Sequence, residues 1–296
     1  MDSSAKIKFW GTRGSTPCAN AENMHFGGNT TCVEIQIPGS DQLLILDCGT
    51  GFRNMGNSLQ AQKRTLKGRI FITHPHWDHL QGFPYFKPFY ERENEFRIYI
   101  PPQELLGCKE ILQGHMSDTF FPVSIDMLEA DIECETYKIG KKNFDDFTIE
   151  YMWAHHTIPT AIYKLEIGGN VVVFAPDNEL PIDGSPESEK FIAEFSAFIQ
   201  SADALIHDAQ YSKEQYLQRQ GWGHCAWELI AELAKEQKVK QLFLVHHDPD
   251  STDDYLSELE VRIKREYSEF EEICLVKEGQ ELILPNKAFY KKVVNR

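Results

Sequence analysis

The sequence has no pair of cysteines at Cys-x-x-Cys spacing, and its seven cysteines are scattered and odd in number. This distribution indicates neither a disulfide framework nor a zinc knuckle, and it favours a reducing compartment. No apolar run reaches the length of a membrane span, and the first residues contain no apolar segment of the kind found in signal peptides. We therefore expect a cytoplasmic protein without a membrane partner.

Positive charge is also scarce in this chain. There are 30 lysines and arginines against 45 aspartates and glutamates, which gives a formal net charge of −15. Such a surface repels nucleic-acid backbones, so we expect no stable binding to nucleic acid. Hydrophobic residues make up 42% of the 296 positions, which is enough for one large core. We predict a single domain over residues 1–296, in which 286–296 form a tail.

What the sequence does contain is a dense group of metal-binding side chains at residues 73–79, directly after an apolar run. In extended or turn-like backbone, side chains two positions apart leave on the same side, so His74 and His76 can reach one cation. Asp78 and His79 follow where the chain must turn, and they can hold a second cation. A solvated histidine-rich loop is the alternative, but the spacing matches ligand geometry. Zinc, manganese and iron all accept such donors.

Other apolar strands end in residues of the same chemistry. The strand ends in question are Asp47, His155-His156, Asp177 and His246-His247. Histidines that merely fill a core have no reason to follow buried strands, whereas ligands that converge at one edge of packed sheets do. We interpret Asp47 as a group that orients a metal-bound histidine or water, with a helix cap as the alternative. The sequence leaves open which histidine of each doublet is the ligand.

Hydrophobic periodicity predicts a chain of mixed strands and helices. The expected strands are 6–10, 32–37, 43–46, 70–72, 96–100, 147–152, 161–167, 171–175, 204–206, 241–245, 273–276 and 281–284, and the expected helices are 103–112, 191–199, 226–235 and 253–265. We expect the last two strands to pair with each other across Gly279. Prolines and aromatic residues alternate within 80–135, which suits a lid or pocket wall beside the site, or ordinary core packing.

In their order along the chain, these residues resemble the motifs of the metallo-β-lactamase superfamily, and the resemblance extends over residues 6 to 285. It implies an α+β fold, a four-layer αβ/βα sandwich of two mixed β-sheets flanked by helices, with a site for two divalent metal ions at one edge. Zn2+ is the expected metal, and Mn2+ or Fe are the alternatives. The implied ligands are His74, His76 and His156 for one ion, Asp78, His79 and His246 for the other, and Asp177 as the bridge.

Several features resemble the phosphodiesterase branch of this superfamily. The bridging ligand is an aspartate instead of the cysteine of the antibiotic-degrading enzymes, and residues 205–209 and Gly223-His224 look like motifs of ribonuclease Z and of cyclic-nucleotide-phosphodiesterase-like bacterial enzymes. Ribonuclease Z carries a long arm for tRNA between its third and fourth motifs, whereas only 20 residues separate His156 from Asp177 here. Together with the acidic charge, this argues against a tRNA-processing role.

The resemblance implies a phosphodiesterase acting on a small-molecule substrate, a cyclic nucleotide or cyclic phosphate, through attack by a metal-bridged hydroxide. We predict that His224, oriented by Asp208, is the general acid, and we assign Asp78 to catalysis as well as to metal binding. In the Gly/Ser/Thr-rich loop after the first strand, Arg13 and Ser15 are the candidate substrate-binding residues, since such a loop can cradle a phosphate.

Three other interpretations keep the same fold. The first is a hydrolase of lactones, thioesters or β-lactams, whose substrates offer a carbonyl in place of a phosphate. The second is an iron-bound oxidoreductase, and the third is a ligand-sensing module without catalysis. We expect a homodimer, because symmetric dimers are the commonest soluble oligomers.

Overall fold

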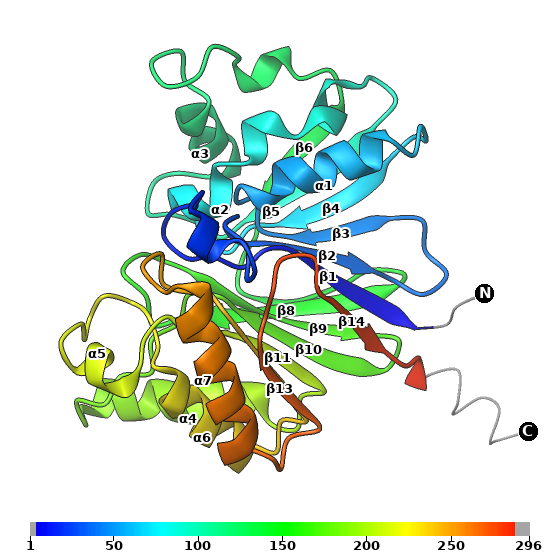
Figure 1. The fold of residues 1–296 in the computed structure, drawn as a ribbon. Helices are drawn as coiled ribbons and strands as arrows, with labels where there is room; N and C mark the ends of the chain where they lie inside the picture. The colour runs from blue at the N-terminus through cyan, green and yellow to red at the C-terminus, as the bar shows by residue number, and fades with distance from the viewer. Residues whose placement is uncertain (1–3, 288–296) are drawn as a thin grey trace, which may run out of the picture.

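Two seven-stranded β-sheets lie face to face in the computed structural model, which describes residues 4–287 (Figure 1). The predicted tail at 286–296 therefore falls mostly outside the described residues. The first sheet has the order β14-β1-β2-β3-β4-β5-β6. Its strands are β1 (Ala5–Gly11), β2 (Cys32–Gln36), β3 (Leu43–Leu46), β4 (Lys67–Phe71), β5 (Glu95–Ile100), β6 (Asp131–Thr136) and β14 (Glu281–Leu284). Strands β3 to β6 are parallel to one another, and the others pair antiparallel.

The second sheet has the order β13-β12-β11-β10-β9-β8-β7. Its strands are β7 (Gly140–Asn143), β8 (Phe147–Trp153), β9 (Ala161–Ile167), β10 (Asn170–Ala175), β11 (Ala204–Asp208), β12 (Gln241–Val245) and β13 (Glu272–Leu275). Strands β10 to β13 are parallel, and β7 to β10 pair antiparallel. Both sheets are thus mixed, as the sequence predicted.

Helices cover the outer face of each sheet (Figure 1). They are α1 (Gly51–Gln60), α2 (Trp77–Leu80) and α3 (Cys108–His115) beside the first sheet, and α4 (Pro186–Ile199), α5 (Lys213–Leu217), α6 (Trp227–Glu236) and α7 (Asp253–Glu266) beside the second. Short 3-10 helices occur at Ala21–Asn23, Phe83–Tyr85, Lys87–Tyr90 and Ile125–Met127. Among the helices of residues 4–287, none is long and apolar enough to cross a membrane.

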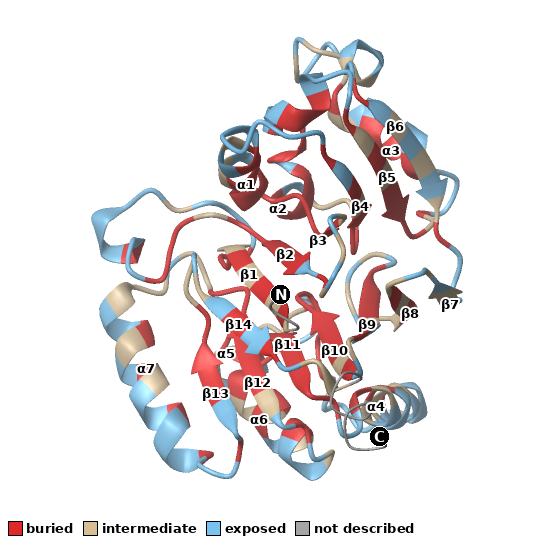
Figure 2. Ribbon diagram, turned by 90° about the vertical axis from the view of Figure 1, so that its right-hand side faces the viewer, coloured by how far each residue is buried: buried red, intermediate tan, exposed pale blue. Residues whose placement is uncertain are grey.

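Three apolar clusters hold these layers together. One lies between the sheets, where Phe9 of the first sheet faces Phe243 of the second with ring centroids 6.3 Å apart. The other two join each sheet to its own helices. Figure 2 shows buried residues along the strands and exposed residues on the outer sides of α4 and α7. The predicted four-layer α+β sandwich is confirmed.

Two predictions about local structure were wrong. The helix expected at 103–112 begins only at Cys108, because Pro101 and Pro102 keep the preceding chain extended and a short turn follows them. The expected hairpin between the last two strands does not form. Instead β13 joins β12 in the second sheet, while β14 pairs with β1 in the first. The connection between them crosses from one sheet to the other, and Gly279 donates its N–H to the carbonyl of Phe9 on the way.

A candidate binuclear metal centre

The candidate ligands gather where the strands of both sheets end. Asp47 follows β3, the 73–79 segment follows β4, Asp177 follows β10 and His246 follows β12, while His156 lies in the connection between β8 and β9. Because the carboxyl ends of parallel strands meet at one edge of a sheet, residues distant in sequence become neighbours there. Figure 1 shows that the loops from the two sheets meet at this edge.

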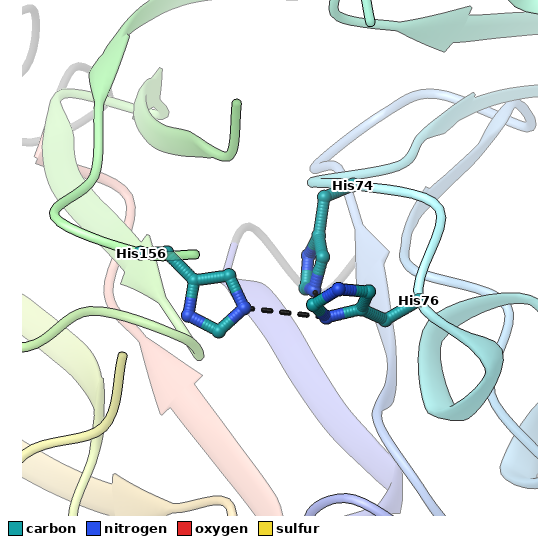
Figure 3. Close-up of side chains that lie close together, drawn as sticks. All are labelled: His74, His76 and His156. Atoms are coloured by element: carbon teal, nitrogen blue, oxygen red, sulfur yellow. Dashed lines mark hydrogen bonds between the residues drawn. The ribbon is translucent and has the colours of Figure 1, made fainter. Parts of the chain in front are cut away.

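Three histidines form the first donor cluster. The Nε2 atom of His74 lies 2.9 Å from Nδ1 of His76, and the Nε2 atom of His156 lies 3.3 Å from the same Nδ1. Figure 3 shows the three rings turned toward one another, two from the loop after β4 and one from the β8–β9 connection. Three imidazole nitrogens this close offer three ligands to a single cation.

Asp78, His79, Asp177 and His246 form the second donor cluster. The Nε2 atom of His79 lies 3.3 Å from Oδ2 of Asp78, and the Nε2 atom of His246 lies 3.1 Å from that same oxygen. All four residues are buried. Two imidazoles and two carboxylates give this cluster the mixed nitrogen and oxygen donors that zinc and similar ions accept.

Asp177 stands between the two clusters. Its Oδ1 atom lies 3.0 Å from His79 Nε2 and 3.3 Å from His246 Nε2. Its Oδ2 atom lies 3.7 Å from His74 Nε2 and 3.8 Å from His156 Nε2. One oxygen therefore faces each cluster, which is the arrangement of a carboxylate that bridges two ions.

Hydrogen bonds within the clusters leave some of the donor atoms unsatisfied, and a bound divalent metal ion would satisfy them. His79 Nε2 and Asp177 Oδ1 are buried without a hydrogen-bond partner, which is costly unless another group completes them. Burial and the neighbouring His156 lower the pKa of His76 to about 4, so this ring is neutral, as a metal ligand must be. Burial opposes protonation of His246, but the carboxylates of Asp177 and Asp78 raise its pKa to about 9. The second cluster thus attracts positive charge.

Asp47 supports the second cluster from behind. It is fully buried, and its Oδ2 atom accepts a hydrogen bond of 2.8 Å from Nδ1 of His79. Its Oδ1 atom accepts from the backbone N–H of Thr73 at 2.7 Å. This leaves His79 Nε2 turned toward Asp177, so the geometry agrees with the orienting role expected from the sequence. Asp47 has a left-handed backbone (φ 61°), as has His246 (φ 62°), and such strain is common at functional sites.

In each histidine doublet, the two side chains have different surroundings. His156 lies in the first cluster and donates from Nδ1 to the carbonyl of Gly223 at 2.8 Å, whereas His155 is exposed. His246 lies in the second cluster, whereas His247 bonds through Nε2 to the carbonyl of Val276 at 2.7 Å. His156 and His246, and not their neighbours, are therefore the candidate ligands.

His224 and Asp208 form the pair expected from the sequence. The Nδ1 atom of His224 lies 2.7 Å from Oδ2 of Asp208. The other carboxylate oxygen, Oδ1, accepts from the backbone N–H groups of Gln210 and Cys225, both at 3.0 Å. The carboxylate is thereby fixed, and it fixes the imidazole. The ring of His224 stacks on that of His246 at 4.8 Å and lies 5.3 Å from that of His156, so it stands beside both clusters.

The loop after β1 does not form the predicted phosphate cradle. All backbone N–H groups of residues 12–16 donate within the protein. Arg13 is fully buried, and its guanidinium donates to the backbone carbonyls of Asn23, Gly27, Asp248 and Ser251. Arg13 therefore ties two loops together and is not available to a substrate. A local motif cannot show that the carbonyls of Asp248 and Ser251 arrive from 235 and 238 positions away.

Ser15, by contrast, does lie at the site. Its backbone N–H donates to Oδ2 of Asp78 at 2.9 Å, and its hydroxyl accepts from the side chain of Gln210 at 3.1 Å. Its side chain is exposed and lines the pocket in front of the metal clusters. The geometry keeps Ser15 as a candidate substrate contact.

Three residues that support the site were not predicted from the sequence. The buried Glu179 accepts from the backbone N–H groups of Gly221 and Gly223, and so it fixes the loop whose carbonyl holds His156. A Cβ atom at Gly223 would lie 2.3 Å from His156 Nδ1, and a Cβ atom at Gly14 would lie 2.3 Å from His246 Nδ1. Only glycine leaves room for these ligands. Gly14 and Gly223 were visible as glycines next to candidate site residues, but Glu179 belongs to no motif.

Comparisons with known proteins agree with this geometry. A family model described as the Beta-lactamase superfamily domain matches residues 43–247. Ribonuclease Z of Archaeoglobus fulgidus is 26% identical over 298 aligned residues, which cover 81% of this chain and 86% of the relative. Ribonuclease Z of Streptococcus suis is 26% identical over 326 residues, which cover 94% of this chain and all of the relative (100%).

Solved structures share the whole fold at low sequence identity. The metallo-beta-lactamase fold protein YhfI of Bacillus subtilis has a TM-score of 0.68 and 19% identity, covering 95% of this chain and 99% of that one. A diphosphatase from the PhnP family has a TM-score of 0.67 and 15% identity, covering 95% and 97%. PDE1 of yeast has a TM-score of 0.66 and 17% identity, covering 95% and 100%. The chain belongs to the metallo-β-lactamase superfamily, and its relatives by sequence include ribonuclease Z.

Proposed function

We propose that this protein is a metal-dependent phosphodiesterase that hydrolyses a small cyclic nucleotide or cyclic phosphate. The observation that carries the proposal is a pair of donor clusters sharing Asp177, with the His224–Asp208 pair beside them. Relatives named ribonuclease Z, whose name denotes cleavage of RNA, support chemistry at a phosphodiester bond.

The reaction takes place in a pocket of about 460 Å³ in front of the clusters. The pocket is lined by His76, Asp78, His156, Asp177 and His224. Two divalent ions held by these residues would supply Lewis acidity, which would lower the pKa of a bound water and offset the charge of a phosphate. The first task of the protein side chains is to hold the donors in place, and Asp47, Glu179 and the two close glycines serve that task.

The second task is to deliver a proton to the departing oxygen. The Nδ1 atom of His224 is engaged by Asp208, so the Nε2 atom is the one left for the pocket. The imidazole can hold a proton at Nε2 and release it to the leaving oxygen as general acid. Ser15 faces the same pocket and offers its hydroxyl to a non-bridging phosphate oxygen.

The surroundings of the pocket favour a small substrate over a long nucleic acid. Among the described residues that line this pocket and the adjoining one at Tyr211 and Trp222, Arg219 is the only lysine or arginine. A protein that holds several phosphates of a polyanion needs several cations along the path. The ribonuclease Z relatives nevertheless make RNA the competing substrate, and it belongs in the experiment.

The test compares His224→Ala with the wild-type protein after reconstitution with zinc or manganese. Substrates are cyclic AMP, a cyclic sugar phosphate, a short RNA and a lactone. We expect turnover of the cyclic phosphates in the wild type and a loss of about 10²- to 10⁴-fold in the variant, with unchanged metal content. His155→Ala is the matched control, since His155 is exposed. Loss of metal from His224→Ala would make His224 a ligand, and preferred cleavage of RNA or the lactone would overturn the substrate proposal.

A further inference from the structure

A second cavity of about 490 Å³ borders the metal pocket, and the two share Pro75 and Trp77. Trp77 stands between the candidate ligands His76 and Asp78, so one wall of this cavity is built on the ligand segment itself. Residues of α3 also line this cavity, together with Phe120 and Phe121. This is the part of the chain in which the sequence suggested a lid or pocket wall.

Large apolar side chains are unusually exposed around this cavity. Phe120 is 76% exposed, Trp77 73%, and Tyr85 and Leu106 52% each. All of these side chains line the same cavity, and the rings of Tyr85 and Phe121 meet edge to face at 5.4 Å. Single exposed apolar residues need no explanation, but a contiguous group beside a reaction site indicates a surface that is covered when a ligand binds.

The cavity also carries polar groups at defined positions. Gln81, Glu110 and His115 lie among its lining residues. Gln81 offers amide donors and an acceptor, and Glu110 offers a carboxylate that already caps α3 at the N–H of Gly107. Burial lowers the pKa of His115, although a hydrogen bond with the backbone of Leu80 opposes this shift. A hydrocarbon chain would offer these groups no hydrogen bonds, whereas a heteroaromatic ring with N–H donors and ring nitrogens can form them.

We propose that this cavity binds the nucleobase of a nucleotide whose cyclic phosphate lies in the metal pocket. The proposal rests on the phosphodiesterase function proposed above, and it names nucleotides, not base-free cyclic phosphates, as the substrate class. The base stacks among Trp77, Tyr85 and Phe120, as bases stack on aromatic side chains in single-stranded nucleic-acid binding. The shared Trp77 places the base directly beside the clusters, which leaves the ribose to span the border between the two cavities.

The kinetic test uses the metal-loaded full chain and two substrates that differ only in the base. These are cyclic AMP and methyl riboside cyclic phosphate, each as the 3′,5′ and the 2′,3′ isomer. We expect Phe120→Ala and Tyr85→Ala to raise KM for cyclic AMP by about tenfold or more, with little change in kcat. The same variants should leave both constants for the base-free substrate unchanged. Tyr255→Ala, at an exposed tyrosine of α7, is the matched control for loss of an aromatic side chain.

A second test measures adenosine binding to the cavity and does not depend on catalysis. Adenosine should quench the fluorescence of the exposed Trp77, the variant Trp77→Phe should lose this signal, and Phe120→Ala should weaken adenosine binding by about tenfold. Free ribose should produce no quenching. Circular dichroism and thermal unfolding show that each variant is folded.

The outcomes separate the two proposals. If neither cyclic substrate is hydrolysed but adenosine binds at Trp77, the phosphodiesterase function fails and the base site stands. If both are hydrolysed with equal kcat/KM, or if the variants affect both substrates equally, the base site is refuted while the function stands. Stronger displacement of adenosine by a long-chain acyl lactone than by cyclic AMP would also refute it.

Discussion

Replacing Gly223 with alanine should weaken metal binding through a single steric contact. The Cβ atom introduced by Gly223→Ala would lie 2.3 Å from Nδ1 of His156, whereas ordinary contacts begin near 3.4 Å. The difference between these distances, 3.4 minus 2.3, requires a displacement of about 1 Å. The ring cannot move without loss, because Nδ1 donates to the carbonyl of Gly223 itself. Nor can the loop, because Glu179 accepts the N–H of Gly223 at 2.8 Å.

Gly221 provides a matched control in the same loop. Gly221 and Gly223 have left-handed φ values of 82° and 86°, so alanine costs about 1–2 kcal/mol of backbone strain at either position. A Cβ atom at Gly221 would meet nothing within 4 Å, however. Both variants should therefore carry similar backbone strain, and in Gly223→Ala the clash with His156 should add a further loss of folding stability. Only Gly223→Ala should also displace His156, and metal sites tolerate ligand shifts of only about 0.2 Å.

We expect Gly223→Ala to lower zinc affinity by about 100-fold or more, the upper end of the range seen when residues that orient a ligand are changed. Titration against a competing chelator measures this affinity, and urea unfolding of the metal-free proteins shows that both variants fold and how much stability each has lost. Activity on cyclic AMP should fall with metal occupancy. Equal zinc affinity for Gly221→Ala and Gly223→Ala would refute the reasoning, since it would show that His156 accommodates the methyl group or does not bind metal.

Three further predictions concern the same region. Removing metal with a chelator should abolish turnover and lower Tm by about 5–10 °C relative to protein at an ion concentration about 100 times Kd, and adding zinc back should restore both; an unchanged Tm would contradict binding to the folded state. Asp47→Asn should lower zinc affinity by about 10- to 100-fold, because Oδ2 of Asp47 orients His79; unaltered affinity would remove Asp47 from the site. Burial lowers the pKa of His207 to about 4 from its ordinary 6.5, so this histidine favours folding above pH 6.5 and loses that contribution as pH falls. Between pH 7 and pH 5, the free energy of unfolding should fall by about 2 kcal/mol more in the wild type than in His207→Gln. Urea unfolding at both pH values measures this difference, and an equal fall in both proteins would refute the assignment.

The strand pattern and the ligand order were predictable because both depend on short-range sequence. Apolar runs that end in Asp47, His74, Asp177 and His246 identify the buried strands and the edge at which they converge. The pairing of β13 and β14 was not predictable in the same way. Two short apolar strands around a glycine look like a hairpin, yet each forms its hydrogen bonds with a strand already placed in a different sheet.

Within the site, the local motifs did not show which histidine of each doublet faces the clusters or what Arg13 contacts. These features depend on contacts between segments that are distant in the sequence. His156 differs from His155 because its ring bonds to the carbonyl of Gly223, 67 positions away. His247 differs from His246 because its ring bonds to the carbonyl of Val276, 29 positions away. The guanidinium of Arg13 met carbonyls that no local pattern reveals, so its predicted role in substrate binding was wrong. Glu179 was missed because an isolated glutamate after a strand has many ordinary uses.

The division of the ligands between the two sheets has a consequence for folding. The 73–79 segment belongs to the first sheet, while His156, Asp177 and His246 belong to the second, and Asp78 meets His246 across 168 positions of sequence. Neither half of the chain alone can complete a cluster, so tight ion binding must await the docking of one sheet on the other. The bound ions then act as cross-links between the halves of the chain. If ions bind there, metal binding and the docking of the two sheets would be thermodynamically linked, and each bound ion would add to the free energy that holds the sandwich together.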